Sequence, residues 1–326
     1  MKRDGLRPRG ICAAFLAGCL ALCLHGCALQ PQRVEGVVKE SSLSQEDREA
    51  LEQLTKAAGE GNAQAQFDLG NMHLRGRGVP QDNKKAAGWF EKAAGQGHVG
   101  AQYLLGFMHD KGHGVPQDDN KAAQWYTKAA NQKDAVAQYT LGTMYQAGRG
   151  VPQSHKKAVE WYTRAATQGY APAQFNLGEM YSAGQGMPQD YKRAVEWLTK
   201  AATQGVAKAQ YTLGVIYSNG QGVPQDYTKA LEWLTKAANQ GDKDAQYLLG
   251  LMYANGEGAP RDYRKAVEWH TKAANQGDMD AQYFLGEIYL RGKGVIRDLQ
   301  RGCKFLRESA EQGHPGAVEL HNRTCF

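Results

Sequence analysis

The sequence predicts an all-α fold, an α/α solenoid wound as a right-handed superhelix of 36-residue helix-turn-helix repeats. An Ala-Gln pair returns every 36 residues without an insertion or deletion, at Ala65-Gln66, Ala101-Gln102, Ala137-Gln138, Ala173-Gln174, Ala209-Gln210, Ala245-Gln246 and Ala281-Gln282. A tryptophan keeps the same step, at Trp89, Trp125, Trp161, Trp197, Trp233 and Trp269. Units of this length bury their apolar faces only against their neighbours, so the fold is elongated and its function depends on its surface.

The first half of each repeat predicts an amphipathic helix, as the fifth repeat illustrates. Ala209, Leu213 and Ile216 fall at i, i+4 and i+7, on one face of a helix that ends at Gly220. Gly214 lies in the helix interior, where glycine costs about 1 kcal/mol relative to alanine. We therefore expect this glycine to permit a close approach of the partner helix.

The second half of the repeat predicts another amphipathic helix after a Val-Pro-Gln turn. Asp226 stands where a side chain can cap the helix N-terminus, and Gly241 closes the C-terminus. Ala230, Trp233 and Leu234 form the apolar stripe between them. We expect the large tryptophan to fill the space above small residues of the first helix.

Both ends of the solenoid depart from the repeat, as expected of caps with a soluble outer face. Residues 45–59 predict a lone second helix in which Gln53 replaces the tryptophan, and Phe305 replaces it in the last unit. A short final helix is predicted at about Pro315 to His321. Residues 45–326 should thus hold about seven repeats plus capping helices, with 16 helices in antiparallel pairs and no strands.

Residues 1–26 have the layout of a signal peptide of the lipoprotein type, and residues 27–44 lack the repeat and predict a flexible tether. An apolar run from Ile11 to Leu24 follows a cationic start, which carries a net charge of +3 from Lys2, Arg3, Asp4, Arg7 and Arg9. The whole chain has a net charge of +6, so the repeats are close to neutral. Phosphate binding needs clustered Lys and Arg, so we expect no nucleic-acid partner.

Two cysteines are candidate lipid acceptors at the end of this leader. The run that ends at Cys19 closely resembles the bacterial lipoprotein box, whereas the run that ends at Cys27 departs from it at His25. Cleavage before Cys19 shortens the apolar segment to about 8 residues, near the lower limit, so we favour Cys27. The alternative is an uncleaved signal anchor from Ile11 to about Leu29.

Either form of the leader predicts an exported protein, which is periplasmic, an outer-membrane lipoprotein, or secreted. It would contact the membrane through its N-terminal lipid anchor. Only Cys303 and Cys325 lie beyond the leader. In an oxidising compartment they can form a disulfide worth about 3 kcal/mol, and two free thiols are the alternative.

The repeats resemble the Sel-one-like repeat family, a branch of the tetratricopeptide superfamily, in the pattern A-Q-x-x-L-G-x-M-Y-x-x-G-x-G-V-P-Q-D-x-x-K-A-x-x-W-x-x-K-A-A. The third repeat carries it at Ala137-Gln138, Leu141-Gly142, Met144-Tyr145, Gly150-Val151-Pro152 and Trp161. The resemblance covers about residues 45 to 320 and implies an α/α superhelix that acts as an adaptor. It also implies contact with host proteins or a place in envelope assemblies, as for exported bacterial members. Certain secreted members that bind penicillins carry one disulfide per repeat, and these repeats lack those cysteines.

Two groups of residues suggest chemistry, and each has a simpler structural explanation. Ser154 and Lys157 match the Ser-x-x-Lys of penicillin-recognising enzymes, yet the serine stands in a helix-cap column that elsewhere holds Asp82, Asp118, Asp190, Asp226 and Asp262. His109 and His113 have a spacing that can bind zinc, with His98 nearby, but His109 occupies a tyrosine packing column. We expect no catalytic residues, no metal and no cofactor.

The variable columns of the first helices predict a binding surface, because residues freed from packing can serve a ligand. They share one face, which lines the concave surface in related solenoids. Apolar side chains gather there in two groups, Leu104 with Phe107 and then Val215, Leu248, Leu251 and Phe284. Exposed apolar surface often marks a partner site, which favours a non-catalytic scaffold for a protein or peptide.

One alternative remains open for this surface and one for the function. Adjacent first helices could bury these apolar side chains against each other. The competing class of function is a hydrolase acting on cell-wall or β-lactam substrates, which requires a pocket with a nucleophile and a base.

Overall fold

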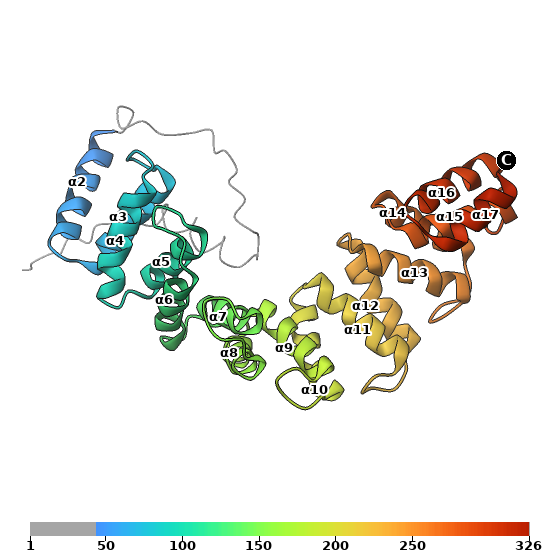
Figure 1. Cartoon of the computed structure of the whole chain (residues 1–326), viewed down its shortest axis with the longest axis horizontal. Coiled ribbons are helices and arrows are strands. Elements are labelled where there is room, and N and C mark those ends of the chain that lie inside the picture. Colours follow the sequence, from blue (N-terminus) through green and yellow to red (C-terminus); the bar gives the residue numbers. More distant parts are fainter. Residues whose placement is uncertain (1–43, 326) are drawn as a thin grey trace, which may run out of the picture.

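A computed structural model describes residues 44–325, and within them it confirms an all-helical solenoid of 16 helices without strands (Figure 1). The predicted signal peptide, nearly all of the predicted tether and both candidate lipidation cysteines lie outside the described residues. The solenoid begins at α2 (Gln45–Gly59) and ends at α17 (Pro315–Thr324), which is longer than predicted.

Seven repeats lie between these two capping helices. Their first helices are α3 (Ala63–Arg75), α5 (Val99–Lys111), α7 (Ala135–Ala147), α9 (Ala171–Ala183), α11 (Ala207–Asn219), α13 (Lys243–Asn255) and α15 (Met279–Arg291). Their second helices are α4 (Asn83–Gly95), α6 (Asp119–Asn131), α8 (His155–Thr167), α10 (Tyr191–Thr203), α12 (Tyr227–Asn239), α14 (Tyr263–Asn275) and α16 (Leu299–Glu311). Each helix packs chiefly on the helices before and after it in the chain. The stack therefore forms the open arc seen in Figure 1.

Side-chain caps and glycines fix the ends of the helices. The aspartate or serine before each second helix accepts a hydrogen bond from the backbone three residues later, as Asp226 does from the Lys229 N–H at 2.9 Å. First helices end at a left-handed glycine, such as Gly220 with φ 68°. In the loop that follows the third repeat's first helix, Gly150 has φ 67°, and a Cβ there would collide with the Asp119 carbonyl of the preceding repeat. These glycines set the path of the turn.

The interior glycine of each first helix accommodates a large side chain of the second helix. A Cβ at Gly142 would lie 2.7 Å from Cδ1 and Cε1 of Tyr162, which is 0% exposed. The expectation that the tryptophan fills this space is wrong. The side chain that does so is the next residue along the second helix, which is Phe90, Tyr126, Tyr162, Leu198, Leu234, His270 or Leu306 in the successive repeats.

The tryptophans instead pack at the junction between repeats. Trp161 is half-buried and packs against a core cluster that contains Ala130, from the second helix of the preceding repeat, and Leu141, from the first helix of its own. Its outer surface is covered by the Arg164 guanidinium, 4.2 Å from the ring centroid. Consecutive helical residues point about 100° apart, so the tryptophan and its neighbour reach different interfaces.

A buried glutamine ladder joins each repeat to the next. Gln138 is 3% exposed, and its Nε2 donates to the Ala130 carbonyl at 3.0 Å. Its Oε1 accepts a 2.8 Å hydrogen bond from Nε2 of Gln168, at the end of the following second helix. The same pairing with the residue 30 positions on recurs at Gln66, Gln102, Gln174, Gln210, Gln246 and Gln282. The buried amide groups are therefore satisfied and fix the register of successive repeats.

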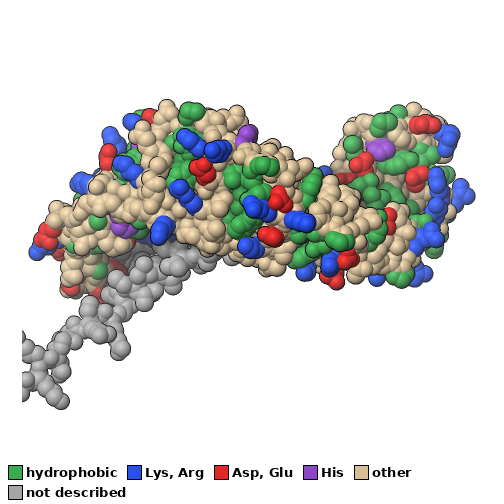
Figure 2. Space-filling model, turned by 90° about the horizontal axis from the view of Figure 1, so that it is seen from below, with side chains coloured by type: hydrophobic (Ala, Val, Ile, Leu, Met, Phe, Trp, Pro, Cys, Tyr) green, Lys and Arg blue, Asp and Glu red, His purple; other side chains and the backbone are tan. Residues whose placement is uncertain are grey.

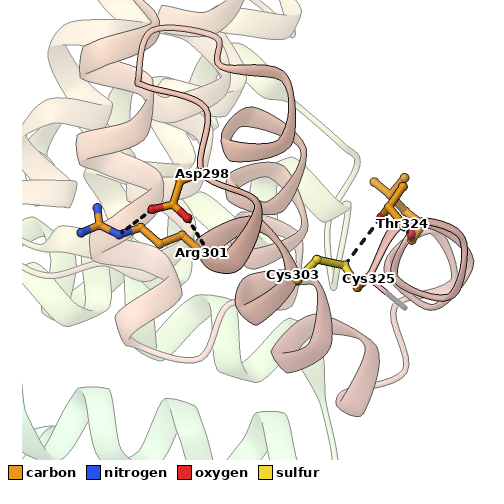
Figure 3. The surroundings of a disulfide bond; sticks show 6 residues. Asp298, Arg301, Cys303, Thr324 and Cys325 are labelled. Atoms are coloured by element: carbon orange, nitrogen blue, oxygen red, sulfur yellow. Dashed lines mark hydrogen bonds and ion pairs between the residues drawn. A yellow bond between two sulfur atoms is a disulfide. The ribbon is translucent and has the colours of Figure 1, made fainter.

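The last repeat is closed by a disulfide between Cys303 of α16 and Cys325, which follows α17 (Figure 3). Their Cα atoms lie 5.6 Å apart. The covalent bond ties the terminal helix, which has only one neighbouring repeat, to the end of the stack.

His270 is the exception among the side chains that cover the interior glycines. It is 0% exposed, and both of its ring nitrogens have no hydrogen-bond partner within residues 44–325. The ring centroids of Tyr247 and Phe284 lie 5.4 and 4.0 Å, respectively, from that of His270. Burial lowers the pKa of His270 from 6.5 to about 3, so the buried ring is neutral at neutral pH.

Replacing Gly142 by alanine should destabilise the protein. The clash with the fully buried Tyr162 ring should cost about 3 kcal/mol, the upper end of the range for overpacking, which outweighs the gain of about 1 kcal/mol in helix propensity. The matched control is Gly88→Ala, an exposed position inside α4 with no atom within 4 Å of a new Cβ, which should raise stability by about 0.5–1 kcal/mol. Urea unfolding followed by circular dichroism measures both. A stabilised Gly142→Ala protein would contradict the close-approach argument.

The protein should lose stability below pH 6.5 because the unfolded His270 binds a proton that the folded one excludes. With a folded pKa of about 3, the loss reaches about 2 kcal/mol between pH 7.5 and pH 5. His270→Leu should be more stable than the wild type and should lose that part of the pH dependence, since Leu234 fills the equivalent position. Thermal midpoints of both proteins at the two pH values test this. Equal pH slopes would show that His270 is protonated in the folded state.

Candidate binding surface on the first helices

The variable columns occupy the sixth and ninth positions of each first helix, and we call these positions the first-helix face. All fourteen side chains are half-buried, at Asp68, Asn71, Leu104, Phe107, Thr140, Thr143, Asn176, Glu179, Thr212, Val215, Leu248, Leu251, Phe284 and Glu287. In Figure 1, α7 and α9 lie toward the inner side of the arc, whereas α8 and α10 lie toward its outer side. The face is thus partly accessible along the whole stack.

The predicted apolar residues of this face differ in how they pack. Leu104, Phe107, Leu248 and Phe284 each pack against a core cluster, so part of their surface is used within the solenoid. Val215 and Leu251 are half-buried without belonging to such a cluster in the described part of the chain. The prediction that these six residues contact a partner stays a prediction. Of the six, Val215 and Leu251 take the smallest part in the packing of the solenoid.

Between the two apolar groups lies an open depression of about 330 Å³, which we call the polar hollow. It is lined by Gln146, Phe175, Asn176, Glu179, Met180, Ser182, Ala183 and Gln185, from α7, α9 and the turn after α9. Gln146 and Ser182 are not among the residues predicted from the sequence. They stand in a third variable column, which holds Leu74, Asp110, Gln146, Ser182, Ser218, Ala254 and Leu290. Following the face one helical turn further would have found them.

The buried Tyr162 and the half-buried Tyr139 support one wall of the polar hollow. The Tyr162 hydroxyl donates a 2.8 Å hydrogen bond to Gln146 Oε1. The Asn176 side chain is hydrogen-bonded to the hydroxyls of Tyr139 and Tyr162. Burial raises the pKa of both tyrosines, so both are neutral and hold the two amide side chains in place.

The carboxylate of Glu179 carries the charge of the polar hollow. Burial raises its pKa, and the hydrogen bond from the Thr212 side chain on α11 opposes that shift. One carboxylate oxygen, Oε1, is buried and has no hydrogen-bond partner among the described residues. Partial burial of a charged carboxylate without a full set of hydrogen-bond or ionic partners costs free energy, which a ligand of opposite charge would offset.

The residues that suggested chemistry have structural roles. The Ser154 hydroxyl caps α8 by accepting from the Lys157 N–H at 3.3 Å, while the Lys157 ammonium lies over the Tyr145 ring, 5.1 Å from its centroid. His98 caps α5 by accepting from the Ala101 N–H, and His109 Nδ1 contacts the Pro116 carbonyl at 3.3 Å. Within residues 44–325 no three potential metal ligands gather, and none of the helices is long and apolar enough to span a bilayer.

Charges of both signs are interspersed on the face seen in Figure 2, with apolar patches between them. That side of the solenoid offers no continuous basic track to a phosphate backbone, which agrees with the near neutrality of the repeats.

Comparison with known proteins supports the repeat assignment along the whole solenoid. The Sel1 repeat model matches seven segments, at residues 63–98, 99–134, 135–170, 171–206, 207–242, 243–278 and 280–314. No curated protein matches the chain significantly.

Two crystal structures resemble the chain closely. A protective antigen present in uropathogenic Escherichia coli strains, which displays an SLR fold, has a TM-score of 0.80 and 37% identity over 83% of this chain and 58% of that chain. The present chain therefore spans less than two thirds of the antigen's length. A Sel1 repeat protein from Oxalobacter formigenes has a TM-score of 0.70 and 35% identity over 88% of this chain and 83% of that chain.

The sequence matches, the solved relatives and the paired-helix architecture agree with one another. Proteins built from these repeats are generally scaffolds for protein–protein interaction and are typically non-catalytic. With seven consecutive matches that fill most of its length, this chain belongs to the Sel1 repeat family.

Proposed function

We propose that this protein is a non-catalytic scaffold that binds a segment of a protein partner across the first-helix face. One observation carries the proposal. The positions that pack one helix on another repeat closely from unit to unit, whereas the fourteen half-buried positions of the first-helix face do not. Packing leaves those side chains free to vary. A partner that contacts several repeats at once would contact them one after another along the stack.

An extended peptide or an amphipathic helix suits this surface. Its apolar side chains can cover Leu104 and Phe107 at one end and Val215, Leu248, Leu251 and Phe284 at the other. Covering half-buried side chains yields less hydrophobic stabilisation than covering fully exposed ones, so we expect affinity to come from several repeats together rather than from one pocket.

The location of the protein is part of the proposal. A lipid on Cys27, with Cys19 as the alternative, would hold the repeats outside the inner membrane, in the periplasm or at the outer membrane, where they could also meet host proteins. The Cys303–Cys325 disulfide supports this location because disulfides persist in oxidising compartments. The solved relative that is a protective antigen also favours export.

Substituting aspartate at both Val215 and Leu251 should weaken peptide binding at least tenfold while leaving the thermal midpoint nearly unchanged, because neither side chain belongs to a core cluster. The probes are peptides selected from a random display library on the wild-type repeats, with Kd measured by fluorescence anisotropy. Ile296→Asp is the control, since Ile296 is 91% exposed in a loop away from the face. Equal binding by the double variant and the wild type would exclude this face.

A Cys27→Ser variant expressed in a bacterial host should lose its lipid and move from the membrane fraction to the soluble fraction, whereas Cys19→Ser should remain in the membrane fraction. Metabolic labelling with a fatty acid, followed by fractionation and blotting, measures both effects. The reverse pattern would assign the lipid to Cys19. Retention in the membrane fraction without fatty-acid labelling, in the wild type and in both variants, would support an uncleaved anchor.

A further inference from the structure

We propose that the polar hollow is a specificity pocket for an arginine side chain of the bound partner segment, and that Glu179 is the residue that recognises its charge. This inference rests on the proposed function, because it assumes that a peptide crosses the first-helix face. It adds the chemistry of one position in that peptide.

Glu179 differs from the other acidic residues of the first-helix face. Glu287 is paired with Arg291 at 2.8 Å, and Asp68 accepts a 3.0 Å hydrogen bond from Gln64 and lies near His98. Glu179 has a hydrogen bond from Thr212, but no Lys, Arg or His of the described residues forms an ion pair with it. Its Oε1 is buried without a hydrogen-bond donor. A cation that enters the polar hollow would supply the ionic partner that the carboxylate lacks.

The neighbours of Glu179 can supply further acceptors. Gln146 Oε1 accepts from Tyr162 and retains a second lone pair. The Asn176 amide is directed to the hydroxyls of Tyr139 and Tyr162, and as a donor to them it leaves its carbonyl oxygen free. Gln146, Asn176 and Glu179 all line the polar hollow. Several acceptors around one carboxylate match a group that carries only donors.

The acceptors and the aromatic ring that line the hollow favour arginine over lysine. A guanidinium is planar and has five N–H donors, which can reach a carboxylate and two amide oxygens together. Phe175 in the lining is half-buried and offers apolar surface for the side-chain stem and a ring on which a guanidinium can stack. Along the stack, the hollow lies between two apolar groups, which are Leu104 with Phe107 and Val215 with Leu248, Leu251 and Phe284. The partner segment should therefore carry its arginine between apolar residues.

The test compares charge recognition in the wild type with that in Glu179→Gln. Peptides selected on the full-length wild-type protein should be enriched in arginine at one position. Replacing that arginine by citrulline, its neutral isostere, should weaken wild-type binding at least tenfold, and replacement by lysine should weaken it severalfold. On Glu179→Gln, the arginine and citrulline peptides should bind within twofold of each other.

The matched control is Glu287→Gln, the same position of the helix in α15, where Arg291 already pairs with the carboxylate. That variant should retain the full discrimination between arginine and citrulline. Thermal midpoints show whether each variant is folded, and Glu179→Gln should be at least as stable as the wild type, because burial disfavours the charged carboxylate. Equal discrimination by Glu179→Gln and the wild type would overturn the pocket.

The outcomes separate this inference from the function on which it rests. One outcome is that peptides fail to bind the Val215→Asp, Leu251→Asp double variant but bind Glu179→Gln as they bind the wild type. That outcome would support the scaffold function and refute the arginine pocket. If a library of adequate diversity yields no peptide that binds the wild-type protein, both proposals fail.

Discussion

The close approach between each interior glycine and the side chain that covers it governs the whole structure. At Gly142 the Tyr162 ring occupies the space that a Cβ would need, and the same contact recurs in all seven repeats. It fixes the separation and rotation of the two helices in each hairpin. The glutamine ladder then sets the register of one hairpin on the next, because a buried amide must keep its partners. A residue inserted within a helix would turn these side chains away from their partners.

This packing also decides where function can reside. The buried positions of both helices and the tryptophan junctions are committed to contacts within or between repeats. The first-helix face is half-buried and differs from repeat to repeat. A solenoid of this kind presents a series of similar positions at fixed spacing, and the identity of each side chain along the series gives specificity.

Along the first-helix face, the apolar ends and the polar hollow have different physical roles. Apolar side chains such as Leu251 add affinity with little directional preference. The hollow contains a carboxylate whose desolvation is incompletely compensated, and such a group distinguishes strongly between ligands that do and do not carry a complementary charge. His270 shows the same cost without a ligand, because its buried ring has no polar partner among the described residues and its pKa falls. The difference is that Glu179 borders a space that a partner can enter.

The sequence by itself determined the solenoid, its 16 helices in residues 44–325, the caps at residues such as Ser154 and Asp226, and the variable face. These follow from local periodicity and capping chemistry, which depend on residues a few positions apart. The sequence could not show which of two adjacent large residues covers the interior glycine, since both lie on the buried side of one helix. It also could not show the polar hollow. There, Tyr162 of α8 bonds Gln146 of α7 and Asn176 of α9, and only the packing of three helices brings those side chains together.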